Sequence, residues 1–217
     1  MIEDLLPAGV AVAEAFDDGE AEPHPEEAAL VARAVEKRRG EFVTARTCAR
    51  RALRELGVEA GPILSGERGE PLWPAGVVGS ITHCDGYRAG AVARAADLLA
   101  VGIDAEPHEP LPDGLLGDIA RPEEAAVLAE LRRAQPAVHW DRLLFSAKES
   151  VYKAWYPLAE RWLGFEDATL TVDADARSFA ARLLVEGPNV GDRRLSGFEG
   201  RWLVRNGLVL TAIALAR

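Results

Sequence analysis

Two carboxylates follow an apolar segment near the middle of the chain. In the sequence VGIDAE, Asp104 and Glu106 are separated by one residue. Because successive side chains of a strand point to opposite faces, these two acids are expected to project together, with Ile103 and Ala105 facing away. Mg²⁺ commonly takes one or two protein carboxylates and completes its shell with water and phosphate oxygens. Acids at a strand end can also be simply solvated, so this segment alone leaves both interpretations open.

A second candidate segment is FSAKESVYKAW at residues 145–155. On a helix, Glu149 and Lys153 are neighbours at i and i+4, and this spacing is typical of an ordinary surface ion pair. Alternatively, Glu149 is a third metal-binding carboxylate or a general base, and Lys148 and Lys153 offset the charge of a phosphate. The chain has only three lysines among its 25 basic residues. Two of them lie in this segment, which favours a site that requires compact ammonium groups.

Two further segments could bind an anion. Residues 37–54 contain seven basic side chains, of which Arg38 and Arg46 are candidates for bidentate phosphate binding; several others must form a solvated helix face. The sequence GSITHC at 79–84 places Thr82 and His83 at the end of an expected strand, where both could contact a phosphate oxygen. A single histidine can equally have a structural role.

Composition limits the classes of partner. The 217 residues include 35 acidic and 25 basic side chains, a net charge of −10, so the surface as a whole should repel nucleic acid and anionic lipid. The chain starts without a basic region and has no apolar run near the roughly 20 residues that span a bilayer. We therefore expect a soluble, cytoplasmic protein with an anion site in a local basic pocket. Cys48 and Cys84 are expected to be reduced thiols, and no zinc-binding spacing occurs.

The first half of the chain is predicted to contain helices followed by a strand meander. A strand at 8–16 and an acidic turn at 17–20 precede helices at 24–39 and 41–56, the second ending before Gly57. Alternating apolar residues then predict strands at 77–82, 88–94 and 98–104.

The second half repeats this order. Residues 105–117 are rich in proline and glycine and are predicted to form a linker. Beyond it we expect helices at 122–133 and 140–158, then strands at 168–172, 178–185, 200–204 and 208–215. The repeated order predicts an α+β fold of two lobes, residues 1–104 and 105–217, with a site at their junction.

Together these segments resemble the 4′-phosphopantetheinyl transferases, most closely the stand-alone Sfp-type enzymes of actinobacteria. The pair GIDxE and FxxKESxxK, about 40 residues apart, is the most specific part of the match. The matching pieces run in family order over roughly residues 35–170 and comprise 38–46, GEP at 69–71, GSITHC at 79–84, VGIDAE at 101–106, 145–155 and RWLGFED at 161–167.

The resemblance implies a Mg²⁺-dependent enzyme that moves 4′-phosphopantetheine from coenzyme A to a serine of a carrier protein and releases adenosine 3′,5′-bisphosphate. It also implies that the two lobes are pseudo-symmetric and form one catalytic unit, with coenzyme A in the cleft between them. By this pattern Asp104, Glu106 and Glu149 bind the metal, and Glu149 takes the serine proton directly or through water. Lys148 and Lys153 would neutralise the pyrophosphate, with Lys153 assisting departure of the leaving group.

The same resemblance assigns the nucleotide end. Arg38, Arg46, Thr82 and His83 look like nucleotide and phosphate contacts. Arg68 would stand near the adenine or the phosphates, with Ser65 in the same loop as another position for this role.

The resemblance also implies carrier-protein partners from fatty-acid, polyketide or nonribosomal-peptide synthases. We expect a monomer that binds neither nucleic acid nor membrane. Tyr152, Trp162 and Phe165 would either surround the pantetheine arm, contact the carrier, or belong to the core. A coenzyme A-binding protein without transferase activity and a metal-dependent phosphohydrolase remain as alternatives. The transferase hypothesis requires that the carboxylates of residues 104, 106 and 149 converge.

Overall fold

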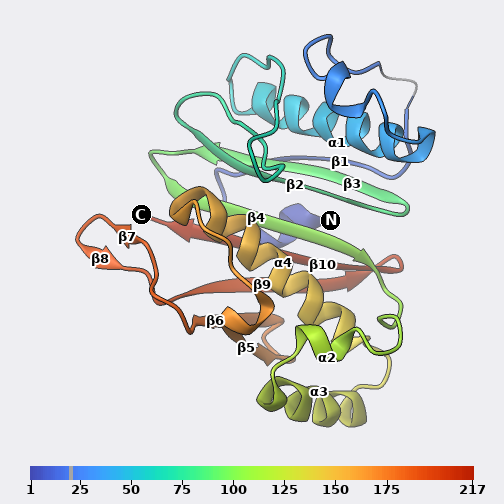
Figure 1. Ribbon diagram of the computed structural model, residues 1–217, viewed down its shortest axis with the longest axis vertical. Coiled ribbons are helices and arrows are strands. Elements are labelled where there is room, and N and C mark those ends of the chain that lie inside the picture. Colours follow the sequence, from blue (N-terminus) through green and yellow to red (C-terminus); the bar gives the residue numbers. More distant parts are fainter. Residues whose placement is uncertain (20–21) are drawn as a thin grey trace.

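The structure, a computed structural model, describes residues 1–19 and 22–217 and consists mainly of two antiparallel sheets, each covered by a long helix (Figure 1). The acidic turn expected at 17–20 ends on Glu20, which lies outside the described residues. None of the helices in the described part of the chain is long and apolar enough to cross a membrane.

The first sheet has three strands in the order β1-β3-β2, with helix α1 (Glu36–Glu55) packed on one face. Its strands are β1 (Ala11–Ala15), β2 (Val77–Cys84) and β3 (Tyr87–Arg94). Helix and sheet are very close at Gly90, where a Cβ atom would lie 2.6 Å from Cα of Ala49. Small residues therefore let α1 lie directly on the sheet.

The predicted helix at 24–39 is wrong in most of its length. This region contains the short 3₁₀ helix η2 (Ala28–Val31), and α1 begins only at Glu36. The buried carboxylate of Glu27 binds the guanidinium of Arg50 at 2.6 Å and the backbone N–H of Ile63 at 2.7 Å. These tertiary contacts fix residues 24–35 in a path that a continuous helix would not follow.

The second sheet has five strands in the order β4-β10-β9-β6-β5. They are β4 (Leu98–Pro107), β5 (Ala168–Asp173), β6 (Ser178–Leu183), β9 (Gly197–Arg205) and β10 (Leu208–Ala216). The helices of this half are α2 (Leu116–Ile119), α3 (Pro122–Ala134) and α4 (Trp140–Ala159). Smaller elements are η1 (Ile2–Leu5), η3 (Phe165–Asp167) and the hairpin β7 (Asn189–Val190) with β8 (Arg193–Arg194).

The predicted α+β class and the repeated element order are confirmed. In each sheet, the strand that comes first in the sequence (β1 or β4) pairs with the strand that comes last (β3 or β10). That last strand also pairs with the strand that precedes it in the sequence (β2 or β9). The expected lobe boundary at 104/105 falls inside β4, and the whole of β4 pairs with β10. The two sheets therefore divide before Leu98, and the expected linker starts only after Pro107 and includes α2.

The two sheets are joined along β2 and β4, which lie side by side (Figure 1). The hydroxyl of Ser80 accepts the backbone N–H of Ile103 at 3.1 Å, and the hydroxyl of Thr82 accepts that of Ala105 at 3.0 Å. Side chains of one sheet thus satisfy backbone donors of the other. Ile103 and Ala105 are fully buried in the core between the sheets, as their alternation with Asp104 predicts.

Helix α4 lies very close to β4. A Cβ atom on Gly102 would overlap the carbonyl oxygen of Ser150 and lie 2.9 Å from the backbone nitrogen of Ala154. A buried hydroxyl cluster holds the helix to β10: the Thr211 hydroxyl is 2.6 Å from that of Ser150 and 3.0 Å from that of Ser146. The glycine of the GIDAE sequence is therefore required by helix packing.

We predict that Gly102→Ala destabilises the protein by about 1–3 kcal/mol, because the added methyl group must push α4 away from β4. Chemical denaturation measures the change. Gly61→Ala is a matched control, since a Cβ atom at Gly61 meets nothing within 4 Å. Equal stability of the two variants would show that the contact at Gly102 is not restrictive.

Candidate active site

A cleft of about 550 Å³ lies between α1, β2 and the C-terminal half of α4. It gathers side chains from both halves of the chain, which the sequence separates widely. Six of the residues singled out as site candidates line it, together with Ser65: Arg38, Arg46, Arg68, His83, Glu149 and Lys153. Asp104, Glu106, Thr82 and Lys148 are not among its lining residues.

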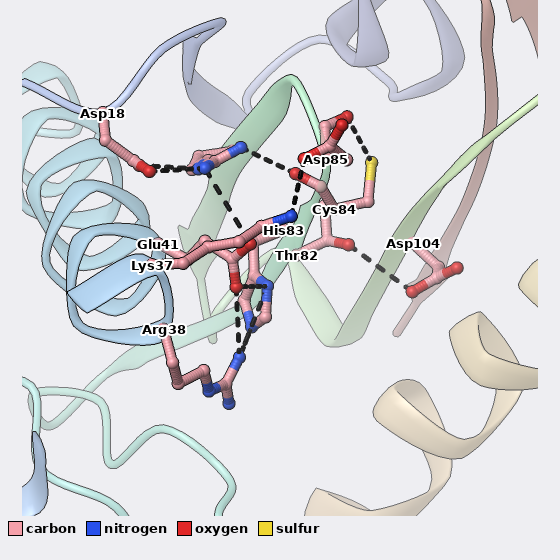
Figure 2. Close-up of polar contacts among 10 residues, drawn as sticks. Asp18, Lys37, Arg38, Glu41, Thr82, His83, Cys84, Asp85 and Asp104 are labelled. Carbon is pink, nitrogen blue, oxygen red and sulfur yellow. Dashed lines mark hydrogen bonds and ion pairs between the residues drawn. The ribbon is translucent and has the colours of Figure 1, made fainter. Parts of the chain in front are cut away.

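Arginines mark one end of the cleft. The Arg38 side chain is half exposed and places Nη1 2.5 Å from Nε2 of His83 (Figure 2). Arg46 is buried; its Nε donates to the carbonyl of Ile63 at 2.9 Å, and its Nη2 donates to the hydroxyl of Ser65 at 2.9 Å. Burial lowers the pKa of Arg46 to about 10, so it remains charged at neutral pH. The two guanidinium groups therefore provide a fixed cation and an accessible one.

His83 is uncharged at this end. Burial, together with the nearby Arg38 and Lys153, lowers the pKa of its imidazole to about 4. At neutral pH the ring can therefore offer a hydrogen bond to an anion but contributes no charge.

Lys153 lines the cleft and binds Asp104, the first of the carboxylates predicted to hold a metal ion. Its Nζ donates to Asp104 Oδ1 at 2.7 Å and to the carbonyl oxygen of Ile103 at 3.1 Å. The ion pair that the i, i+4 spacing would give between Glu149 and Lys153 is not present among the ion pairs of residues 1–19 and 22–217. Lys153 instead fastens α4 to β4 across the edge of the cleft.

Glu106 is bound by an arginine that the sequence analysis did not identify. Arg142 Nη1 donates to Glu106 Oε2 at 2.9 Å, and its other nitrogens donate to the carbonyls of Glu109 and Pro110. Burial and the nearby Asp104 raise the pKa of Glu106 to about 7, although Arg142 acts in the opposite direction. A possible signal was the spacing of seven residues between Arg142 and Glu149, which places them on one helix face.

The chemistry of these three acids suits a hard divalent cation. Burial and the charge of Asp104 raise the pKa of Glu149, so its ionised form is disfavoured unless a cation binds nearby. Asp104 Oδ2 is buried and lacks a hydrogen-bond partner among the described residues, as expected for an oxygen that an absent group would satisfy. In the described part of the chain, however, no three His, Cys, Asp or Glu side chains form a ready metal-binding group. The donor types fit Mg²⁺, but the predicted convergence of the three carboxylates on one position is not seen among the described residues. Asp104 is instead bound by Lys153, and Glu106 by Arg142.

Lys148 requires a correction, because its ammonium group does not reach the cleft. It is 4% exposed and donates to Glu124 Oε2 at 2.8 Å. Its other N–H groups donate to the carbonyl oxygens of Ile119 at 2.9 Å and Phe165 at 2.7 Å, and the carbonyl oxygen of Ala168 lies 3.3 Å from Nζ. Because these acceptors satisfy the ammonium group, we assign Lys148 to the structure that holds α4 against α3 and residues 165–168, and not to phosphate binding.

Thr82 also has a different position from the one expected. Its hydroxyl is buried, accepts the N–H of Ala105 and lies 3.4 Å from Asp104 Oδ1 (Figure 2). It therefore supports the carboxylate that Lys153 binds and does not face the nucleotide end of the cleft.

A smaller apolar pocket of about 130 Å³ adjoins the cleft, and Glu149 and Tyr152 line both. Its other lining residues include Trp162 and Phe165. The rings of Tyr152 and Trp162 are 5.1 Å apart, and the Trp162 side chain is 65% exposed. Trp162 is therefore not a core residue, and it forms part of an open apolar wall beside Glu149.

Comparison with known proteins gives a consistent assignment for both halves of the chain. Residues 26–93 match the model of the 4′-phosphopantetheinyl transferase N-terminal domain, and residues 100–198 match that of the 4′-phosphopantetheinyl transferase superfamily.

Similar proteins cover the whole chain. The 4′-phosphopantetheinyl transferase Svp of Streptomyces mobaraensis is 60% identical over 100% of this chain and 89% of its own length. The transferase PptT of Mycobacterium tuberculosis is 51% identical over 99% of this chain and 98% of its own. The transferase Npt of Nocardia iowensis is 51% identical over the full length of both chains. The resemblance seen in the sequence is thereby confirmed, and the chain belongs to the 4′-phosphopantetheinyl transferase superfamily of enzymes.

Proposed function

We propose that this enzyme transfers 4′-phosphopantetheine from coenzyme A to a serine hydroxyl of a carrier protein and releases adenosine 3′,5′-bisphosphate. The observation that carries the proposal is the composition of one cleft, which is lined by Arg38, Arg46 and His83 from α1 and β2 and by Glu149 and Lys153 from α4. A long substrate with phosphates at two places requires such a division between a binding end and a reacting end.

At the binding end, Arg38 and Arg46 bind phosphate by charge and His83 binds it by a hydrogen bond. Arg68 lines the same cleft beside the loop that contains Ser65, consistent with a contact to the nucleotide. The small pocket formed by Tyr152, Trp162 and Phe165 is suited to the apolar part of the pantetheine arm.

At the reacting end, the serine oxygen attacks phosphorus and the bond to the adenosine bisphosphate breaks. Glu149, which lines both cavities, accepts the serine proton, and the Lys153 ammonium stabilises the charge that develops on the leaving phosphate. Asp104, Glu106 and Glu149 would hold Mg²⁺, which supplies positive charge to the diphosphate. Arg142 orients Glu106, and Thr82 supports Asp104.

The partners and setting remain predictions. We propose carrier domains of fatty-acid, polyketide or nonribosomal-peptide synthases as acceptors, and a cytoplasmic monomer that binds neither nucleic acid nor membrane. We also propose that the two halves have different roles: residues 1–104 supply most of the nucleotide contacts, and residues 105–217 supply most of the catalytic groups.

The function is tested by incubating the protein with coenzyme A, Mg²⁺ and an unmodified carrier protein and then measuring intact masses. A pantetheine-sized gain on the carrier is expected, whereas coenzyme A cleavage without that gain would indicate a phosphohydrolase. No change in either molecule would indicate a protein that only binds coenzyme A. Removal of the divalent ion with a chelator should stop the reaction.

Glu149→Gln and Asp104→Ala should each slow carrier modification by about 10²-fold or more, because each removes a group that acts on the transition state. Glu130→Gln is the control, since this acid is exposed on α3. Wild-type turnover by either of the first two variants would remove that residue from the mechanism.

Replacing Lys148 should mainly reduce stability, whereas replacing Lys153 should mainly reduce the rate of turnover. Lys148→Met breaks a buried ion pair and should lower the free energy of unfolding by about 3 kcal/mol. Lys153→Met should destabilise less, because its side chain is 27% exposed, but it should slow turnover by about 10²-fold. Denaturation and single-turnover rates measured below both melting temperatures distinguish the two. A stable Lys148→Met protein without turnover would restore the phosphate-binding role of Lys148.

A further inference from the structure

A buried acid lies inside the cationic end of the cleft. Glu41 is 9% exposed and follows Arg38 by one turn of α1. Its Oε2 is 3.9 Å from Arg38 Nη1 and 3.6 Å from His83 Nδ1, and its Oε1 is 4.0 Å from Arg88 Nη2 (Figure 2). Three elements, α1, β2 and β3, thus direct polar groups at one carboxylate.

Arg88, one of these neighbours, is itself rigidly held. It is 4% exposed, and two of its nitrogens bind the carboxylate of Asp18 at 2.8 and 2.6 Å. A third donates to the carbonyl of Cys84 at 2.6 Å. Asp18 in turn packs on Gly40, where a Cβ atom would be only 3.1 Å from its Oδ2. Arg88 therefore gives Glu41 a fixed cationic neighbour, which limits where its carboxylate can lie.

A negative charge at this place is unexpected for a site that binds phosphate, because like charges repel. If Glu41 acted only through its charge, its removal would strengthen binding of an anion. Its presence is better explained by what it does to its neighbours.

Arg38 needs such a support. Its side chain is 53% exposed, and an exposed arginine loses rotamer entropy when it becomes ordered. His83 cannot hold it by charge, since the imidazole is neutral. Arg38 Nη1 lies 2.5 Å from Nε2 and 3.4 Å from Nδ1 of His83, and Nδ1 lies 3.6 Å from Oε2 of Glu41. The carboxylate is thus placed to orient both groups.

We propose that Glu41 is a positioning residue that holds Arg38 and His83 in the orientation that binds a phosphate group of the nucleotide. This inference rests on the proposed function, since it assumes that the cationic end receives that phosphate. Glu41 does not touch the ligand; it reduces the ordering cost of the groups that do.

The test is a calorimetric titration with adenosine 3′,5′-bisphosphate, which binds without reacting further. Glu41→Gln preserves the shape of the side chain and should weaken binding about tenfold, as loss of outer-shell partners typically does. In turnover assays, the KM for coenzyme A should rise by a larger factor than kcat falls. Unchanged or tighter binding would overturn the proposal.

Glu36→Gln is the matched control for charge. Glu36 is an exposed acid in the first turn of the same helix, so its removal changes the net charge equally without affecting Arg38 or His83 by contact. Binding to this variant should be unchanged or slightly tighter. If Glu41→Gln does not fold, Glu41→Asp, which withdraws the carboxylate by one methylene, should also weaken binding, and unchanged affinity would again overturn the proposal.

Arg38→Ala distinguishes failure of this inference from failure of the proposed function. If Arg38→Ala weakens binding but Glu41→Gln does not, only the role of Glu41 is wrong. If neither does, the nucleotide does not bind at this end of the cleft. In the Arg38→Ala background, Glu41→Gln should have a smaller effect than in the wild type, because one of the groups that it orients is gone.

Discussion

The close contact between α4 and β4 at Gly102 determines where the reacting end of the cleft can form. Because Gly102 has no side chain, the helix backbone lies directly over the strand, and the carbonyl of Ser150 occupies the space of the missing methyl group. Two residues further along β4, Asp104 is therefore within reach of Lys153. The buried hydroxyls of Ser146, Ser150 and Thr211 prevent the helix from sliding along the sheet. A larger residue at 102 would separate the groups on which the proposed chemistry depends.

Two of the acids proposed to bind the metal are paired with cations. Asp104 binds Lys153, and Glu106 binds Arg142. Burying isolated charges would be very costly, so each carboxylate needs a cation in the folded protein. These two pairs keep some solvent exposure, so a ligand can replace or share the partner. The pair of Lys148 and Glu124 is enclosed and remains structural. The same kind of interaction therefore has different roles according to its exposure, and residue type alone does not distinguish them.

Much of the fold was predictable because periodicity and turn residues reflect local structure. The strands of both sheets, α3, α4 and most of α1 were predicted in this way, and the alternation in GIDAE correctly placed Ile103 in the core. The helix at 24–39 was not, since the contacts of Glu27 with Arg50 and Ile63 involve residues distant in sequence. Gly40, which falls between the helices predicted at 24–39 and 41–56, lies inside α1, where Asp18 packs close to it.

The prediction that Lys148 and Lys153 share one site failed for a geometric reason. A residue advances by about 100° around a helix, so two lysines five positions apart differ by about 140° in direction, which disfavours both reaching one cleft. Glu149 and Lys153, four positions apart, differ by only about 40° and do line it together. Helix geometry could thus have separated Lys148 from Lys153, although it could not show which one faced the cleft. That choice is fixed by Glu124 on α3, which accepts Lys148 and also the backbone N–H of Leu170, so that the enclosed pair is joined to the second sheet.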